Sequence, residues 1–283
     1  MIRYRLPAGS VPPLTDVIGH LLAVGQTLSV RTKRGDVVEV SADDVVAIKA
    51  LAAAPVRTGD IRNLEHAAAL AWPGAEHEWV GGWLLRFGHG STRRANSAVP
   101  LDVSAGAVGE LIDWYAARGL PPLVAAPDRL FRVPPEVATD GENLVMTGEL
   151  RHSAGGVSIA SAPDEDWLRL YRREVPVDVL TAVIDGEVAF AEVGGAAVGR
   201  AAVTMAPDGT RWVGLSAVHV VEEARRRGLA RELCAALLAW GGGRGATRAY
   251  VQVLVGNVAA MRLYESMGFT VHHRTRYVDA RSL

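Results

Sequence analysis

Arg225-Arg226-Arg227-Gly228-Leu229-Ala230 is the most informative stretch of this chain. It follows a β-rich run at 214–221 and opens an apolar helical run, which predicts a strand-to-helix junction. The first turn of a helix leaves backbone N–H groups without intrahelical partners, and the helix dipole adds partial positive charge there. Gly228 lets the backbone approach a ligand closely. The junction therefore predicts a site for an anion such as a pyrophosphate.

A second motif, NVAAMRLYESMGF at residues 257–269, follows after one more predicted strand. The two motifs have the forms R-x-x-G-x-A and N-x-x-x-x-x-x-Y-x-x-x-G-F. In order and spacing they resemble the signature of the GCN5-related N-acetyltransferase (GNAT) superfamily, whose acetyl-CoA motif is written Q/R-x-x-G-x-G/A. Two unrelated helix ends are a poor explanation of this combined match.

The resemblance implies an α/β chain with the α+β GNAT fold, in which helices flank a mixed central sheet. Strands and helices alternate in the C-terminal part of the sequence, as that fold requires. We expect strands at 181–184, 188–193, 199–206, 211–220, 248–254 and 269–278. We expect helices at 163–173, 228–240 and 257–266.

The N-terminal segment has a different pattern. Strands at 27–33 and 36–40 flank the turn Lys33-Arg34-Gly35-Asp36, and a short turn followed by a strand fits residues 41–49. We expect a small SH3-like β-barrel over residues 1–54, by pattern alone. Residues 54–60 combine Pro, Gly and polar side chains and predict a linker.

Between these parts, a helix at 63–71, strands at 79–87 and 91–99, a helix at 106–118 and a strand at 123–125 are expected. This segment lacks the R-x-x-G-x-A motif. It therefore resembles a degenerate N-terminal GNAT-like half, residues 60–152, ahead of a C-terminal acetyl-CoA-binding domain, residues 153–283. The whole chain resembles tandem-type bacterial acetyltransferases that carry an SH3-like module.

The resemblance implies acetyl-CoA as cosubstrate. Backbone atoms of Val218 and Val220 would hold the pantetheine arm, and the Val220 N–H would polarise the thioester carbonyl. Asn257 would cap the last helix and also meet the arm, although a purely structural cap remains open. The pyrophosphate would lie on the junction, whose residues are Arg225, Arg226, Arg227, Gly228, Leu229, Ala230 and Arg231.

Acetyl transfer to an amine also needs an acid and a base. Tyr264 is the expected general acid, because a phenol stays protonated at neutral pH and can protonate the departing thiolate. His219 is a weak candidate for the base, since strand alternation turns it away from the face of Val218 and Val220. Ser216, expected on the face of Val218, could orient a water.

Trp83, Arg86, Arg94 and Asn96 are candidate acceptor-binding residues, by resemblance to the first half of tandem-type enzymes. Arginines suit carboxylates. The alternative is that Trp83 packs in the core and that the arginines form structural contacts. The acceptor would be a small-molecule or peptide amine of unknown identity.

The composition narrows the remaining options. The chain has 283 residues and a net charge of −1, so nothing favours nucleic acid as a partner. Neither a signal core nor an apolar run of membrane-spanning length is evident, which predicts a cytoplasmic protein without membrane contact. Arginines far outnumber lysines, which suggests a bacterial genome rich in GC. Oligomeric state cannot be predicted.

Two further patterns argue against other chemistries. The lone Cys234 lies among leucines and predicts helix packing rather than a disulfide or a catalytic thiol. His272 and His273 are adjacent on a predicted strand and should point to opposite faces, so no metal site is expected. We therefore expect an N-acetyltransferase that acts by direct attack in a ternary complex. The alternative is a catalytically silent CoA-binding regulatory or partner-binding protein.

Overall fold

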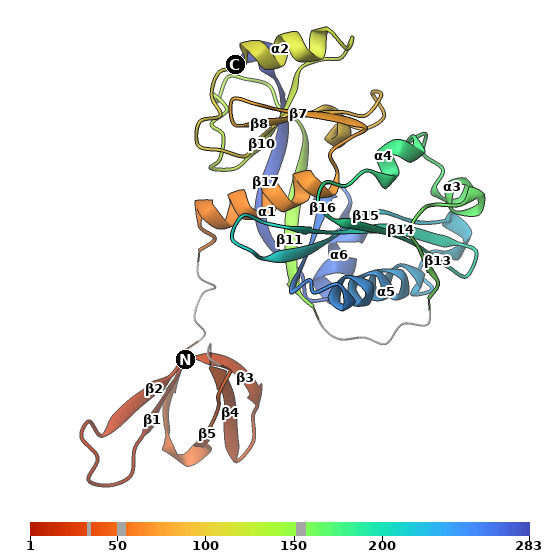
Figure 1. Cartoon of the computed structure of the whole chain (residues 1–283). Coiled ribbons are helices and arrows are strands. Elements are labelled where there is room, and N and C mark those ends of the chain that lie inside the picture. The colour runs from red at the N-terminus through yellow and green to blue at the C-terminus, as the bar shows by residue number, and fades with distance from the viewer. Residues whose placement is uncertain (33–34, 50–54, 151–156) are drawn as a thin grey trace. The chain divides into compact units, whose positions relative to one another are not determined.

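The computed structural model describes residues 1–32, 35–49, 55–150 and 157–283. The chain forms two compact units, Met1–Pro55 and Val56–Leu283 (Figure 1). Three predicted features involve residues outside the described ranges: the turn residues Lys33 and Arg34, Ala54 of the linker, and the boundary at 152–153. The linker is shorter than expected, because the first helix already begins at Thr58.

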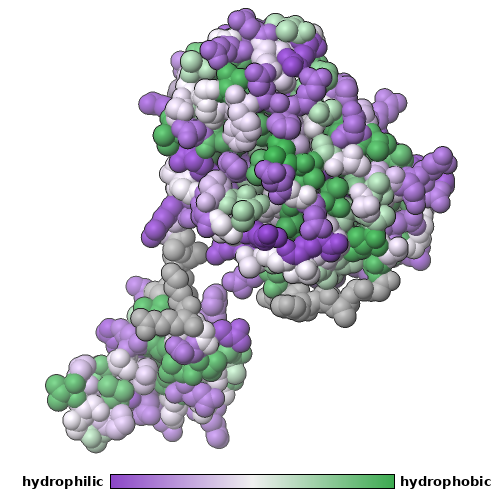
Figure 2. All heavy atoms as spheres, in the orientation of Figure 1, coloured by the Kyte–Doolittle hydropathy of each residue, from purple (hydrophilic) through white to green (hydrophobic). Residues whose placement is uncertain are grey.

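The N-terminal unit consists of two three-stranded antiparallel sheets, ordered β2-β1-β6 and β3-β4-β5. Their strands are β1 (Ile2–Arg5), β2 (Leu14–Val17), β3 (Gly19–Ala23), β4 (Thr27–Thr32), β5 (Val37–Ser41) and β6 (Val45–Ile48), with the 3₁₀ turn η1 (Ala42–Asp44) before β6. Alternate residues such as Leu28, Val30 and Val40 form a small core. Other hydrophobic side chains remain on the surface of this unit (Figure 2).

An eight-stranded sheet forms the centre of the second unit, in the order β10-β17-β11-β16-β15-β14-β13-β12. The strands are β10 (Leu123–Pro127), β11 (Asp140–Glu149), β12 (Ile159–Ala160), β13 (Glu187–Val193), β14 (Ala197–Met205), β15 (Arg211–Val220), β16 (Arg248–Leu254) and β17 (Thr270–Asp279). Neighbours are antiparallel except for the parallel pair β15–β16, so the sheet is mixed, as predicted.

Helices cover both faces of this sheet (Figure 1). Helices α5 (Leu229–Gly243) and α6 (Val258–Ser266) pack on one face, and α1 (Thr58–Ala71), α3 (Glu165–Tyr171) and α4 (Val177–Thr181) pack on the other. Strand β14 is buried on both sides, because Ala201 contacts the cluster under α5 while Ala202 contacts the cluster under α1. We call these the α5 face and the α1 face.

A second, three-stranded sheet joins β7 (Glu76–Val80), β8 (Trp83–Phe87) and β9 (Val99–Pro100). Helix α2 (Gly109–Ala116) packs Leu111 and Tyr115 against β8 and β10. Strands β10 and β11 precede the predicted boundary at 152–153, yet they lie in the eight-stranded sheet. The division of the second unit into two halves therefore remains a prediction.

Three element predictions were wrong in detail. Residues 79–87 form a hairpin rather than one strand, because Gly81 and Gly82 adopt positive φ angles. Residues 91–99 form turns and the 3₁₀ segment η2 (Arg94–Asn96) before β9. Of residues 181–184, Thr181 is the last residue of α4 and the other three form no strand. No helix in the described ranges is long and apolar enough to cross a membrane.

Candidate functional site

Strands β15 and β16 pair over only part of their length. They pair in parallel from Trp212–Arg248 to Leu215–Val251. Beyond this point β15 continues along β14 to Val220, while β16 continues along β11 to Leu254. The carboxyl ends of the two strands are therefore not paired with each other, and we call this unpaired region in the middle of the sheet the opening.

A β-bulge lies at this opening. The register between β14 and β15 shifts between Val198 and Arg200, and Ala217 has a φ of 52°. Because of the extra residue, Leu215 and Val218 both pack on the α5 face. The expectation that Ser216 shares a face with Val218 is wrong: Ser216 Oγ accepts a hydrogen bond from the Arg200 guanidinium at 3.2 Å, among groups of the α1 face.

The backbone of β15 directs polar groups into the opening. The Val221 N–H donates to the Ala196 carbonyl of the β13–β14 turn at 2.9 Å. Since peptide groups alternate in direction along a strand, those of Val218 and Val220 point away from β14, toward β16. The Val220 carbonyl accepts a hydrogen bond from Arg225 Nε at 3.3 Å.

The junction after β15 presents a run of backbone donors. Gly228 is the N-cap of α5 with a φ of 85°, and Arg226 also has a positive φ. In the described structure, no hydrogen-bond partner is found for the N–H groups of residues 226–230. Such a concave run of amides at a helix N-terminus favours an anion. The exposed side chains of residues 225–227 add positive charge.

Arg231 differs from the rest of the predicted cradle. Its N–H donates to the Gly228 carbonyl at 3.0 Å. Its guanidinium donates to Ser266 Oγ at 2.6 Å and thereby ties α5 to the end of α6. The backbone N–H of Arg231, which was predicted to bind a pyrophosphate, is therefore already hydrogen-bonded within the protein, and so is its guanidinium.

Tyr264 lies on α6, buried in the cluster under α5. Burial raises the pKa of its phenol well above 10, and the neighbouring Cys234 thiol raises it further. The phenol is therefore protonated at any physiological pH. Burial also raises the pKa of Cys234 to about 12, so this thiol is neutral and packs as the sequence predicts.

His219 and Asn257 lie at the edges of the opening. His219 is half-buried, and burial together with Arg225, Arg173 and Arg172 lowers the pKa of its imidazole below 6.5. A neutral imidazole can accept a proton. Asn257 Oδ1 accepts the Ala260 N–H at 3.1 Å and caps α6.

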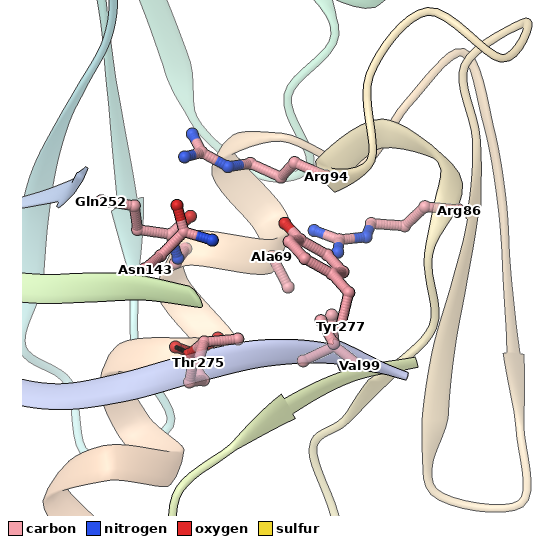
Figure 3. Close-up of a pocket in the computed structure, with 11 residues that line it drawn as sticks. Ala69, Arg86, Arg94, Val99, Asn143, Gln252, Thr275 and Tyr277 are labelled. Atoms are coloured by element: carbon pink, nitrogen blue, oxygen red, sulfur yellow. Dashed lines mark hydrogen bonds between the residues drawn. The ribbon is translucent and has the colours of Figure 1, made fainter. Parts of the chain in front are cut away.

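A small pocket on the α1 face holds two of the four predicted acceptor residues, Arg86 and Arg94 (Figure 3). The Arg94 guanidinium extends toward the amide groups of Asn143 and Gln252. Gln252 directly follows Val251, where β15 and β16 part, so the pocket adjoins the opening. The pocket has room for about one water molecule.

The other two predicted acceptor residues have structural surroundings. Trp83 is buried under α2 against Phe131, with a ring distance of 5.2 Å. Asn96 is buried and holds the preceding loop: its Oδ1 accepts the N–H groups of Gly88 and Gly90 at 2.8 and 3.0 Å. Neither side chain lines the pocket of Arg94.

A buried polar chain of Glu65, His273 and His272 was missed by sequence reasoning. Glu65 on α1 lines the pocket, and its Oε1 lies 2.7 Å from His273 Nε2. Thr275 Oγ1 donates to the same oxygen at 3.2 Å. Glu65 sits between Leu64 and the alanines of a buried helix face, which is the one sequence signal for a buried carboxylate.

The expectation that His272 and His273 point to opposite faces is also wrong. Their Nδ1 atoms lie 2.8 Å apart. The register between β11 and β17 shifts between Val145 and Met146, so His272 is the extra residue of a bulge and its ring turns beside His273. Among the described residues, no group of three metal-ligating side chains is present.

Two family models together match most of the chain. The model described as "Probable histone acetyltransferase Rv0428c C-terminal" matches residues 58–278. The model described as "Rv0428c N-terminal Sm-like domain" matches residues 1–49. The N-terminal module is thus Sm-like by family, which corrects the SH3-like expectation.

Similar proteins point to the same chemistry. A Mycobacterium tuberculosis protein named "Probable histone acetyltransferase Rv0428c" is 53% identical over 290 residues, covering 100% of this chain and 94% of that protein. The "Uncharacterized N-acetyltransferase YobR" of Bacillus subtilis is 27% identical and covers 75% of this chain and 95% of its own length. A GCN5-related N-acetyltransferase structure from Kribbella flavida shares the fold, with a TM-score of 0.55 at 15% identity over 78% of this chain and 96% of that one.

Proposed function

Because the chain belongs to the acetyltransferase family of these models, a GNAT family, we propose that it transfers an acetyl group from acetyl-CoA to a primary amine. The observation that carries the donor is the opening between β15 and β16, which ends beside the unpaired amides of residues 226–230. An extended pantetheine arm fits between parted strands, and a pyrophosphate fits a helix N-terminus.

Different parts of acetyl-CoA are bound by different residues of this site. The peptide groups of Val218 and Val220 hold the arm as an added strand would, and the N–H groups of residues 226–230 take the pyrophosphate. The side chains of residues 225–227 add attraction for its charges. Asn257 stands at the start of α6, on the far side of the opening from β15.

The chemistry is direct attack in a ternary complex. The amine nitrogen attacks the thioester carbon, the carbon–sulfur bond breaks, and the amine proton leaves to a base. The Val220 N–H stabilises the developing oxyanion. Tyr264 supplies the proton for the departing thiolate, which its raised pKa supports. His219 is the candidate base, supported by its neutral imidazole.

Thiol release from acetyl-CoA tests this function. We expect amine-dependent release by the wild type, and a loss of about 100-fold in kcat for Tyr264→Phe, the range for a general acid, with acetyl-CoA binding kept in calorimetry. Tyr4→Phe in the N-terminal unit controls for loss of a phenol elsewhere.

The amine panel should contain amino acids, polyamines and lysine peptides, since the name of the Mycobacterium tuberculosis relative refers to histones. Acetyl-CoA binding without turnover on any amine would instead favour the silent regulatory protein. Absence of acetyl-CoA binding would refute the proposed donor site.

A further inference from the structure

Among the described residues, no carboxylate pairs with the guanidinium of Arg94. Its side chain is partly buried and its Nε atom is fully enclosed without a hydrogen-bond partner. Within the described ranges its guanidinium forms neither a hydrogen bond nor an ion pair. Its guanidinium carbon lies 5.8 Å from the centroid of the Trp72 ring, a cation–π distance. Enclosed donors are normally satisfied, so this group points to a missing partner.

The surroundings of Arg94 carry an excess of positive charge. Arg86 and Arg200 are both buried, and their guanidinium groups donate to carbonyl and hydroxyl oxygens rather than to carboxylates. Among the buried side chains of the described residues, Glu65 is the single carboxylate, and it is already bonded to His273. Buried charges are usually paired, so an anion from outside would relieve this imbalance.

The groups around Arg94 suit a planar anion. The amides of Asn143 and Gln252 and the hydroxyl-bearing Tyr277 line the same pocket. Figure 3 shows the Arg94 fork extending toward the two amides. A guanidinium fork matches a planar carboxylate with two parallel hydrogen bonds, which favours a carboxylate as the anion.

The position of Arg94 links this anion to the reaction. Gln252 lies one residue beyond Val251, the last residue of β16 that pairs with β15, so the pocket meets the opening on the α1 face. The anions of the donor have their own site at the start of α5, on the other face.

We propose that the acceptor is an amine that also carries a carboxylate, an amino acid in chemical class, and that Arg94 binds its carboxylate beside Asn143 and Gln252. The inference rests on the proposed function, because it assigns the second substrate of the same site. With the carboxylate fixed at Arg94, the amine can extend toward the end of the opening, where Val220 and Tyr264 act.

Binding and turnover should be measured with matched pairs of acceptors. Each of the twenty L-amino acids and its α-amide is titrated into the full chain saturated with CoA, and initial rates are measured with acetyl-CoA. We expect at least one amino acid to bind and react roughly 10- to 100-fold better than its amide, the range for a charge-assisted hydrogen bond.

Variants of Arg94 decide whether this residue causes the preference. Arg94→Gln should bring the acid-to-amide ratio close to one, and Arg94→Lys should leave an intermediate ratio, because it keeps the charge but loses the fork. Arg93→Gln is the matched control: this neighbouring arginine is exposed and pairs with Asp140 outside the pocket, so its ratio should equal that of the wild type.

The outcomes separate this inference from the proposed function. Amides that bind as well as acids, lysine peptides preferred to amino acids, or no amino acid bound at all would overturn the role of Arg94. An equal loss for acid and amide in Arg94→Gln would do the same and would assign the residue to stability. Carboxylate-dependent binding without thiol release would refute the transferase, while the assignment of a carboxylate site at Arg94 would stand.

Discussion

At the scale of single residues, Gly214 leaves room for Tyr250 where β15 pairs with β16, just before this pairing ends. A Cβ atom placed on Gly214 would lie 2.2 Å from the Tyr250 ring and hydroxyl. Tyr250 is buried against Trp212 and cannot move away freely. We predict that Gly214→Ala lowers the free energy of unfolding by about 1–3 kcal/mol, measured by urea titration.

Gly242 gives the matched control for this prediction. It lies in α5, and a Cβ there would meet nothing within 4 Å. Gly242→Ala should raise the free energy of unfolding by about 0.4–1 kcal/mol, because alanine restricts the unfolded chain. Equal effects of the two substitutions would contradict the close approach of β15 and β16 at Gly214.

The chain of Glu65, His273 and His272 predicts acid sensitivity. Burial, with a smaller effect of His273, lowers the pKa of His272 from 6.5 to about 4. Burial opposes ionisation of Glu65, but hydrogen bonds from His273 and Thr275 outweigh it and leave the pKa of Glu65 below 4.5. Between pH 6.5 and 4 the unfolded chain therefore binds more protons than the folded one.

The free energy of unfolding should consequently fall as the pH drops from 6.5 to 4, because over this interval His272 is protonated in the unfolded chain but not in the folded one. We predict a falling Tm over this interval, followed by circular dichroism at unit steps of pH. His272→Gln removes the group and should flatten the slope. A variant that loses stability over the same interval as steeply as the wild type would show that His272 is not the cause.

Predictions for single residues were correct where the residue type has a local structural role, such as capping a helix. Asn257 caps α6 through its own side chain, as predicted. Such predictions failed where a bulge inserts a residue. Ser216 and His272 were both assigned to faces by strict alternation, and a single extra residue in β15 and in β17 reverses that assignment.

At the scale of elements, the exposed arginines just before α5 predict that positive charge strengthens CoA binding. Replacing Arg225, Arg226 and Arg227 together by glutamine keeps the backbone amides but removes three exposed cations. We predict that CoA binding weakens by about tenfold, since exposed charges each contribute modestly, and that it becomes less sensitive to salt. Calorimetry at two ionic strengths measures both effects.

S-Acetylpantetheine supplies the control ligand, because it retains the thioester arm but lacks the nucleotide and its phosphates. Its binding should be equal in the wild type and in the triple variant. An equal loss for both ligands would mean that the arginines support the fold of the junction rather than the phosphates.

Elements with a clear period were predicted well, and those shaped by distant contacts were not. Strand β16 matches its expected range, 248–254. The segment 181–184 has β-branched residues and was expected to be a strand. Instead, the guanidinium of buried Arg200 donates hydrogen bonds to the carbonyls of Leu180 and Ala182 at 2.6 and 2.9 Å and fixes the backbone around this segment. No pattern in the segment itself reveals a partner that lies on β14.

At the scale of the whole molecule, each unit has a hydrophobic core of its own. The cluster around Leu28 and Val30 draws only on residues before Ser41 and on Val45, and every other cluster lies within Val56–Leu283. The opening, the junction before α5 and the pocket of Arg94 also lie in the second unit.

We therefore predict that residues 56–283 fold alone, bind acetyl-CoA with unchanged affinity and melt within about 4 °C of the full chain, a shift worth roughly 1 kcal/mol for a unit of this size. Residues 1–55 should be marginally stable alone, because so short a chain buries little of its surface. Calorimetric scans of both fragments and of the full chain measure this. A fragment 56–283 that does not fold, or that loses acetyl-CoA binding, would show that the N-terminal unit completes the core or the site.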